Sequence, residues 1–270
     1  MPFGPQHFDF IATMATNTNK YDDDDFFAKY QEMARSKYGL EAAGEWSTMV
    51  KMIPDLKGKR VLDIGCGYGW HCFFATEQGA ASVVGIDNSH KMLQVAERKS
   101  KELFSHDDAK YKSIEFMNMS IEDMDFPEGS FDVVISSLAL HYVQSFADAA
   151  IKIARFLKPT EGEFVFSVEH PIFTSYGTGD WIYNEDGKLD HWPVDRYFSE
   201  GFRTTNFLGC EVVKYHKTLT TYINSLVTTG LFRITQVIEP LPEPDMLAKM
   251  PEEARRPMML LIAAKKLQVD

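Results

Sequence analysis

The chain has 270 residues, of which 44% are hydrophobic and 25% are charged, and its formal net charge is −11. This balance supports a folded core, and the length fits one large α/β domain or two small ones. The acidic excess argues against nucleic acid as the main partner, because nucleic-acid binders usually carry a basic surface. The sequence contains no run of about 18 apolar residues, which argues against a membrane span. The first residues, MPFGPQHFDF, lack the pattern of a secretory signal, so we expect a cytoplasmic protein.

The cysteines indicate a reduced protein without a metal site. There are three of them, Cys66, Cys72 and Cys210, and no two form a CxxC pair. An odd number without paired spacing favours neither a disulfide framework nor a zinc site. The composition does not indicate the oligomeric state.

The N-terminal region is expected to form a helical cover. Residues 1–20 are weakly patterned and predict a loose arm. The acidic run Asp22–Asp25 is typical of a helix N-terminus, where carboxylates cap backbone amides. Amphipathic helices are predicted over 25–36 and 40–53, the second of them ending at Pro54.

A regular alternation begins near residue 60 and predicts a parallel sheet. Short apolar segments are separated by helical ones, which is typical of right-handed βαβ units. The expected strands are 61–65, 82–87, 113–118, 131–137 and 163–170. One expected helix follows the first strand and ends near residue 79, and two others span 89–105 and 145–157.

The alternation ends after residue 170. An aromatic-rich segment predicts an inserted lid, and a helix over about 217–229 and strands at 231–240 and 258–266 follow. Too little chain joins these two strands for a helical crossover, so we expect an antiparallel pair at a sheet edge. A single domain fits best, composed of a cover (1–54), a core (55–170), a lid (171–216) and a C-terminal helix and strand pair (217–270).

The sequence VLDIGCGYG at 61–69 places a glycine-rich turn between a strand and a helix. Glycines there let backbone approach a ligand closely, but dinucleotide-binding enzymes use a similar loop. Their fingerprint has its third glycine one place later than Gly69, where Trp70 stands. Asp63 would oppose a pyrophosphate, whereas its charge favours a cationic sulfonium.

A second carboxylate, Asp87, ends the second strand 22 residues after Gly65. At that place it can accept hydrogen bonds from both hydroxyls of a ribose. Capping of the next helix is the alternative, although Asn88 or Ser89 can do this instead.

Three motifs together resemble the class I S-adenosylmethionine-dependent methyltransferases. They are Asp63-x-Gly65-x-Gly67-x-Gly69, Asp87 with Asn88-Ser89-His90-Lys91-Met92, and Phe126-Pro127-Glu128-Gly129-Ser130-Phe131-Asp132. The chain is similar to the branch that includes the quinone-biosynthesis and biotin-pathway enzymes, over about residues 55–170 and more loosely over the last two strands. The resemblance implies a doubly wound, Rossmann-like α/β fold whose seven-stranded, mostly parallel sheet has an antiparallel last strand. It also implies S-adenosylmethionine as cofactor and S-adenosylhomocysteine as product.

The resemblance also implies roles for particular residues. The Asp63 region, Gly65, Gly67 and Gly69 would hold the methionyl end of the cofactor, and Asp87 would hold the ribose. The adenine would contact Asn88, Met92, Ser120 and Ile121, and the methionyl amine would contact main-chain atoms of Ser137 and Leu138. Ser120 replaces the family's usual Asp, so Glu122 or Asp123 can take its part.

The acceptor side has no comparable motif. His141, just after the fourth strand, is the candidate general base, and packing on the next helix is the alternative. His170 follows the fifth strand and is a candidate for contact with the acceptor. From the cover, Tyr30 and Arg35 are expected to close over the cofactor, with Arg35 pairing its carboxylate. The aromatic residues expected to line the acceptor pocket, unless they only pack the lid, are Trp181, Tyr183, Trp192 and Tyr197.

These features predict methyl transfer from S-adenosylmethionine to a small molecule, with no nucleic-acid or membrane partner. Two alternatives remain open from the sequence. One is an NAD(P)-dependent oxidoreductase that uses the glycine loop for pyrophosphate, and the other is a non-catalytic module that binds S-adenosylmethionine.

Overall fold

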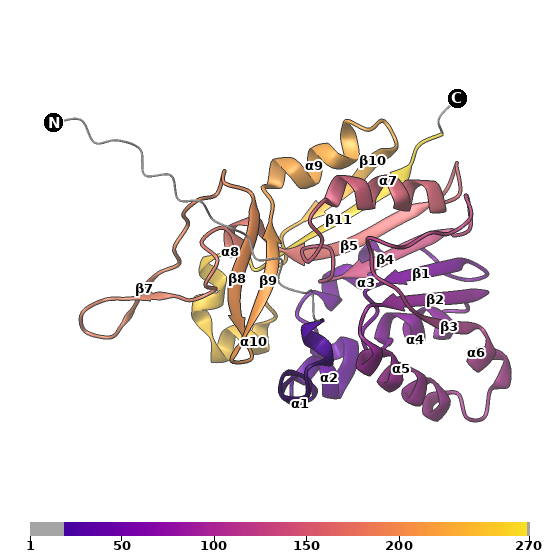
Figure 1. Ribbon diagram of the computed structural model, residues 1–270, viewed down its shortest axis with the longest axis horizontal. Helices are drawn as coiled ribbons and strands as arrows, with labels where there is room; N and C mark the ends of the chain where they lie inside the picture. Colours follow the sequence, from indigo (N-terminus) through magenta and orange to yellow (C-terminus); the bar gives the residue numbers. More distant parts are fainter. Residues whose placement is uncertain (1–18, 269–270) are drawn as a thin grey trace.

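A computed structural model describes residues 19–268, and its centre is a seven-stranded sheet (Figure 1). The strand order is β10-β11-β5-β4-β1-β2-β3, and β11 runs antiparallel to both of its neighbours. The strands are β1 (Arg60–Ile64), β2 (Ser82–Asp87), β3 (Ile114–Asn118), β4 (Val133–Ser137), β5 (Glu163–Glu169), β10 (Phe232–Ile238) and β11 (Met259–Lys266). The predicted mostly parallel sheet and its antiparallel last strand are confirmed.

Helices cover both faces of this sheet because alternate strand residues point to opposite sides. In β5, Phe164 and Phe166 pack on one face, whereas Val165 packs on the other, and all three are fully buried. The first face is covered by α7 (Phe146–Phe156) and α9 (Leu219–Val227), which lie together in Figure 1. The other is covered by α3 (Trp46–Met52), α4 (Trp70–Glu77) and α5 (His90–Leu103), and the short α6 (Asp108–Lys112) precedes β3.

The N-terminal cover is more broken than its periodicity predicts. The two expected helices are replaced by η1 (Lys20–Asp22), α1 (Asp24–Gln31), α2 (Ala34–Tyr38), η2 (Gly39–Ala42) and α3. The chain is extended at Met33 (ψ 146°), and Gly39 has φ +72° with the Trp70 ring against it. These two positions end the helices early, so the cover can bend around a cavity. The expected loose arm lies outside the described residues, except for residues 19 and 20.

The segment after β5 contains secondary structure that the sequence did not reveal. After α8 (Pro171–Thr174) come the short pair β6 (Ile182–Tyr183) and β7 (Leu189–His191), and then the hairpin β8 (Gly201–Phe207) and β9 (Cys210–His216). Leu208 and Gly209 both have positive φ, which suits the right-handed twist of a two-residue hairpin turn. The link between β10 and β11 contains α10 (Pro244–Lys249) and η3 (Pro251–Arg255). Within residues 19–268, none of the helices has the length and apolarity that a membrane crossing requires.

Candidate cofactor and acceptor site

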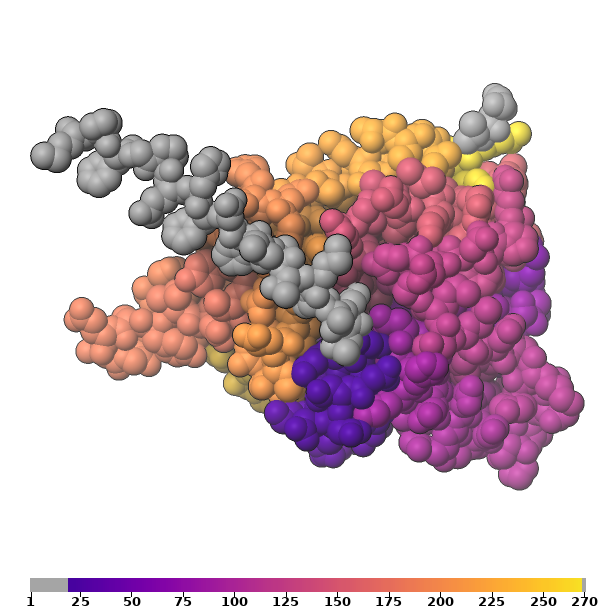
Figure 2. All heavy atoms as spheres, viewed as in Figure 1, coloured from indigo at the N-terminus to yellow at the C-terminus, as the bar shows by residue number. Residues whose placement is uncertain are grey.

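A cavity of about 1170 Å³ lies at the carboxyl ends of β1, β2, β4 and β5. This is the edge at which open α/β sheets bind ligands. The sheet contributes the glycine loop, Asp87, Ser137 and Glu169, and the walls above them come from the N-terminal cover and the β8–β9 hairpin. Phe26 of α1 packs against Phe207 of β8, and Figure 2 shows these two parts of the chain lying against each other. Two segments far apart in the sequence therefore close the cavity together.

The glycine loop bends because its three glycines adopt conformations that other residues avoid. Gly65, Gly67 and Gly69 have φ of +71°, +53° and +80°. A Cβ on Gly65 would lie 2.3 Å from the Cβ of Ala139, whereas one on Gly67 would meet nothing within 4 Å. Gly65 and Gly67 line the cavity; Gly69 instead caps α4. At Gly65 and Gly67 the loop thus presents main chain without a side chain to the cavity.

Asp87 fastens this loop from the end of β2. One carboxylate oxygen accepts a hydrogen bond from the Gly67 amide at 2.9 Å, and the other accepts one from the Ser89 amide at 2.9 Å. Ser89 caps α5, because its hydroxyl accepts from the Met92 amide. Burial raises the pKa of Asp87 to about 6, against the opposing effect of these two amides. Each oxygen keeps acceptor capacity for a ligand hydroxyl.

Asp63 lies beneath the loop and is not part of the cavity wall that the structure describes. It is buried, and one of its oxygens is 3.4 Å from the Cys72 thiol while the other has no hydrogen-bond partner among residues 19–268. Burial raises its pKa to about 7. An acidic group therefore sits below the loop, where a cationic ligand above would favour its ionised form.

The far end of the cavity is lined by residues expected at an adenine. Asn88, Met92 and Ile121 line it, together with Glu122. Ser120 is not among the lining residues described; its hydroxyl donates to Asp123 at 2.7 Å and accepts from the Asp123 amide. Of the two residues considered as replacements for Ser120, Glu122 is the one at the cavity.

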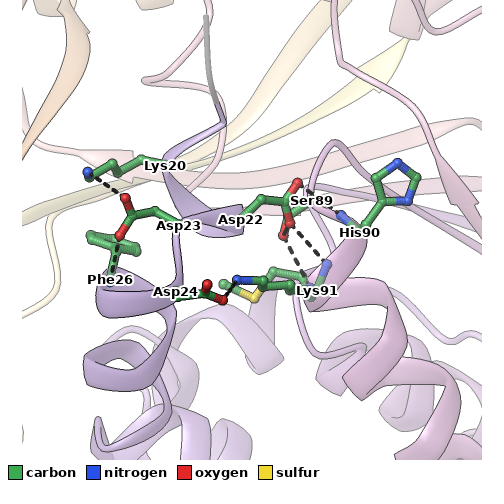
Figure 3. A network of polar contacts seen from close by, with 9 residues as sticks. Lys20, Asp22, Asp23, Asp24, Phe26, Ser89, His90 and Lys91 are labelled. Atoms are coloured by element: carbon green, nitrogen blue, oxygen red, sulfur yellow. Dashed lines mark hydrogen bonds and ion pairs between the residues drawn. The ribbon is translucent and has the colours of Figure 1, made fainter.

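Residues of the acidic run at 22–25 have two structural roles, only one of which was expected (Figure 3). Asp23 caps α1 by accepting from the Phe26 amide, as the sequence predicts. Asp22 instead reaches α5 and accepts from the Ser89 hydroxyl at 2.7 Å and from the Lys91 amide at 3.0 Å. These hydrogen bonds outweigh the effect of burial and lower the pKa of Asp22. The cover is thus tied to the helix that follows Asp87.

Tyr30 and Arg35, expected from the cover, both line the cavity. Arg35 donates to Glu45 at 2.9 Å and to the Ser137 hydroxyl at 3.3 Å, and that hydroxyl donates to Glu45 at 2.7 Å. Ser137 ends β4, and the next residue, Leu138, has φ +52°, a strained conformation for a branched side chain. No sequence motif pointed to Glu45.

On the acceptor side the structure places His141 at the cavity. It is buried, and its Nδ1 accepts from the Glu169 amide at 3.4 Å. Burial, followed by the charges of Lys214 and Lys217, holds the pKa of His141 well below its usual value, so the ring is neutral at pH 7. Lys214 is also buried; it pairs with Glu169 and lies 5.4 Å above the Phe207 ring. Glu169, at the end of β5, and Phe207, in the unpredicted hairpin, were missed by sequence reasoning.

The other expected acceptor residues lie away from the described cavity wall. His170 caps α8 through Nδ1 and bonds Glu239 at 2.7 Å through Nε2. Trp181 and Trp192 pack around the Arg256 guanidinium, which lies 4.1 Å from the Trp192 ring centre. Tyr183 is exposed, and the Tyr197 hydroxyl accepts from the Leu219 amide. Packing within the lid, the alternative considered from the sequence, describes Trp181, Trp192 and Tyr197 in the structure, but not Tyr183.

Comparisons with known proteins agree with this geometry. The methyltransferase domain family matches residues 62–166. A solved structure from Listeria monocytogenes, assigned to the S-adenosylmethionine-dependent methyltransferases, is 49% identical and covers 84% of this chain and 100% of its own, with a TM-score of 0.75. A demethylmenaquinone methyltransferase from Lactococcus lactis is 34% identical over 62% of this chain and 72% of its own. A tRNA U34 carboxymethyltransferase from Alcanivorax borkumensis is 29% identical over 40% of this chain and 32% of its own.

The family match contains the glycine loop, Asp87 and the carboxyl ends of β1, β2 and β4 at the cavity. The comparisons support S-adenosylmethionine as the cofactor and not a nicotinamide nucleotide, the alternative that the sequence left open. The chain belongs to the S-adenosylmethionine-dependent methyltransferases.

Proposed function

We propose that the chain methylates a small molecule that binds in the same cavity as the cofactor. The observation that carries this proposal is the size of the cavity. At about 1170 Å³ it exceeds the roughly 300–1000 Å³ of a pocket for one small ligand. A second molecule therefore has room beside the cofactor, against the β8–β9 hairpin.

The proposed cofactor half contains the residues that the sequence analysis expects at the cofactor and that also line the cavity. They are Gly65, Gly67, Asp87, Asn88, Met92, Ile121, Ser137, Leu138, Tyr30 and Arg35. In this proposal Asp87 holds the ribose, and Asp63 and Gly69 act from below by shaping the loop. The cofactor supplies an electrophilic methyl group on a positively charged sulfur. The protein has to hold the acceptor in line with that bond and exclude water, a proximity effect that is worth several kcal/mol.

The proposed acceptor half lies between His141, Tyr142, Phe207 and Lys214. Because Nδ1 of the neutral His141 ring accepts from the Glu169 amide, Nε2 carries the ring hydrogen. The ring can therefore take a proton from an acceptor hydroxyl only at Nδ1, once this long hydrogen bond is released, and such a base matters only if the acceptor arrives protonated. Aromatic rings on two sides suit a flat acceptor. The similarity to a demethylmenaquinone methyltransferase supports a ring of this kind.

An RNA acceptor is the second candidate, because a tRNA-modifying enzyme is among the relatives. The net charge of −11 opposes it, since phosphate neutralisation supplies much of the affinity for RNA. The walls formed by the cover and the hairpin also leave the cavity suited to a small molecule.

We further propose that all four parts of the chain, 1–54, 55–170, 171–216 and 217–270, act as a single domain, since the first and third both wall this cavity.

The test is release of S-adenosylhomocysteine with two sets of acceptors. One set contains small phenols, hydroquinones and enols, and the other contains unmodified transfer RNA. We expect turnover with a member of the first set and none with the second. Turnover that requires RNA would overturn the proposal.

A further inference from the structure

Glu45 is a buried, charged residue whose hydrogen bonding is incomplete. It stands just before α3 in the cover, and it is 1% exposed. Its Oε1 accepts from Arg35 and from the Ser137 hydroxyl, whereas its Oε2 has no partner among residues 19–268. A buried carboxylate oxygen without a partner is costly, and native proteins rarely leave one. This oxygen therefore needs a donor that the described residues do not supply.

The surroundings favour a charged donor. Burial raises the pKa of Glu45, but the Arg35 charge and the Ser137 hydrogen bond outweigh it, so the pKa lies below its usual value and the group is ionised. His71, at the same place in the cavity, is neutral, because burial and then Arg35 lower its pKa to about 4. Arg35 and Glu45 are thus the local charged pair.

Arg35 also has donors to spare. Only its Nη2 makes hydrogen bonds within the described residues, to Glu45 and to Ser137. Its side chain is 23% exposed and lines the cavity with Glu45, Gly65 and Ser137. Its Nε and Nη1 can therefore serve a ligand carboxylate, and a guanidinium suits one well.

We propose that Glu45 and Arg35 together bind the amino acid end of the cofactor, with Glu45 Oε2 accepting from its ammonium and Arg35 donating to its carboxylate. The two protein charges match the two ligand charges at the end of β4. This assignment rests on the cofactor alone and not on the acceptor proposed above. It makes the N-terminal cover part of the cofactor site, and it gives the site a means to recognise the methionyl group.

The experiment measures the affinity of three thioethers by calorimetric titration of the full chain. S-Adenosylhomocysteine carries both charged groups; its analogue with a 3-carboxypropyl chain lacks the ammonium, and its analogue with a 3-aminopropyl chain lacks the carboxylate. In Glu45→Gln an amide NH₂ group takes the place of Oε2 and faces the ammonium. We expect S-adenosylhomocysteine to bind about ten- to a hundredfold more weakly. The carboxypropyl analogue should bind both proteins equally.

Arg35→Gln should show the reverse selectivity. This variant should bind S-adenosylhomocysteine and the carboxypropyl analogue more weakly than the wild type does, and its affinity for the aminopropyl analogue should be unchanged. Glu41→Gln, on the exposed side of η2, is the matched control and should change none of the affinities. Thermal unfolding of each variant checks that it folds.

Two results would overturn the assignment. One is a Glu45→Gln variant that loses the same affinity for all three ligands, which would mean that Glu45 only holds the cover in place. The other is a folded Glu45→Gln variant that keeps full affinity for S-adenosylhomocysteine. Neither result depends on whether an acceptor has been found, so a failure here is distinct from a failure of the proposed function.

Discussion

The two halves of the cavity are built in different ways. The proposed cofactor half lies at strand ends of the parallel sheet, with main chain at Gly65 and Gly67 and the carboxylate of Asp87, and the N-terminal cover closes it. The proposed acceptor half takes its side chains from the β8–β9 hairpin and from His141 and Tyr142, which follow β4. The first half lies mainly within residues 62–166, which the family model matches, whereas Phe207 and Lys214 of the second lie outside them. Sequence motifs therefore point to the cofactor and not to the acceptor.

The largest expected effect tests the acceptor half. His141→Ala should lower kcat about 10²- to 10⁴-fold if this ring removes a proton, while the affinity for S-adenosylhomocysteine stays within about twofold. Because the pKa of His141 lies well below its usual value, the ring stays neutral from pH 8 down to pH 6, and wild-type kcat should not fall over that range through this group. The assay is S-adenosylhomocysteine release with the acceptor found in the panel. Turnover near that of the wild type would remove His141 from the mechanism.

The next effect tests the cofactor half through its backbone. Gly65→Ala should destabilise the fold by about 2–5 kcal/mol, from about 1–2 kcal/mol for the left-handed conformation and about 1–3 kcal/mol for the clash with Ala139. Gly67→Ala carries only the first cost, because its Cβ meets nothing within 4 Å. Denaturant unfolding of both variants gives the comparison. Equal losses of stability would show that the contact with Ala139 does not matter.

Asp87→Ala should weaken S-adenosylhomocysteine about ten- to a hundredfold, because a charged hydrogen bond is worth roughly 1.5–3 kcal/mol. The ionised carboxylate is the better acceptor for the ribose. With a pKa of about 6 in the free protein, wild-type affinity should therefore fall as the pH drops through 6, and this dependence should vanish in the variant. Calorimetric titration between pH 5 and 8 tests both expectations. An unchanged dissociation constant would mean that Asp87 does not hold the ribose.

The smallest effect concerns the hydrogen bonds between the N-terminal cover and α5. Asp22→Asn weakens the tie from the cover to α5 and should cost about 1 kcal/mol, or roughly fivefold in the affinity for S-adenosylhomocysteine. Asp24→Asn, which removes an exposed carboxylate paired with Lys91, is the control and should have almost no effect. The same titration compares them. Equal losses would indicate a general charge effect in place of a specific tie.

The sheet could be predicted from the sequence because each parallel strand is a short apolar run followed by a helix. The predicted strand at 61–65 is observed at Arg60–Ile64, and the one at 82–87 is observed as Ser82–Asp87. The glycine loop and Asp87 follow directly from those strands. Their places in the cavity were therefore local consequences of the sequence.

The hairpin and the cover contacts could not be predicted in the same way. The turn at Leu208-Gly209 lacks the Asn-Gly or Asp-Gly pair that marks a two-residue hairpin. Asp22 meets Ser89 across 67 residues, and Glu45 meets Ser137 across 92 residues. Such pairs depend on how the cover lies on the finished sheet. The positions of Trp181 and Trp192 could not be predicted for a related reason. Both rings pack around Arg256, which comes from the distant link before β11.

A crystal structure of the protein with S-adenosylhomocysteine would show directly whether the glycine loop and Asp87 hold the cofactor. We expect the thioether to lie against the main chain of Gly65 and Gly67, with the ribose hydroxyls about 3 Å from the Asp87 carboxylate. A ligand bound elsewhere, or a ribose whose hydroxyls do not reach Asp87, would contradict this expectation.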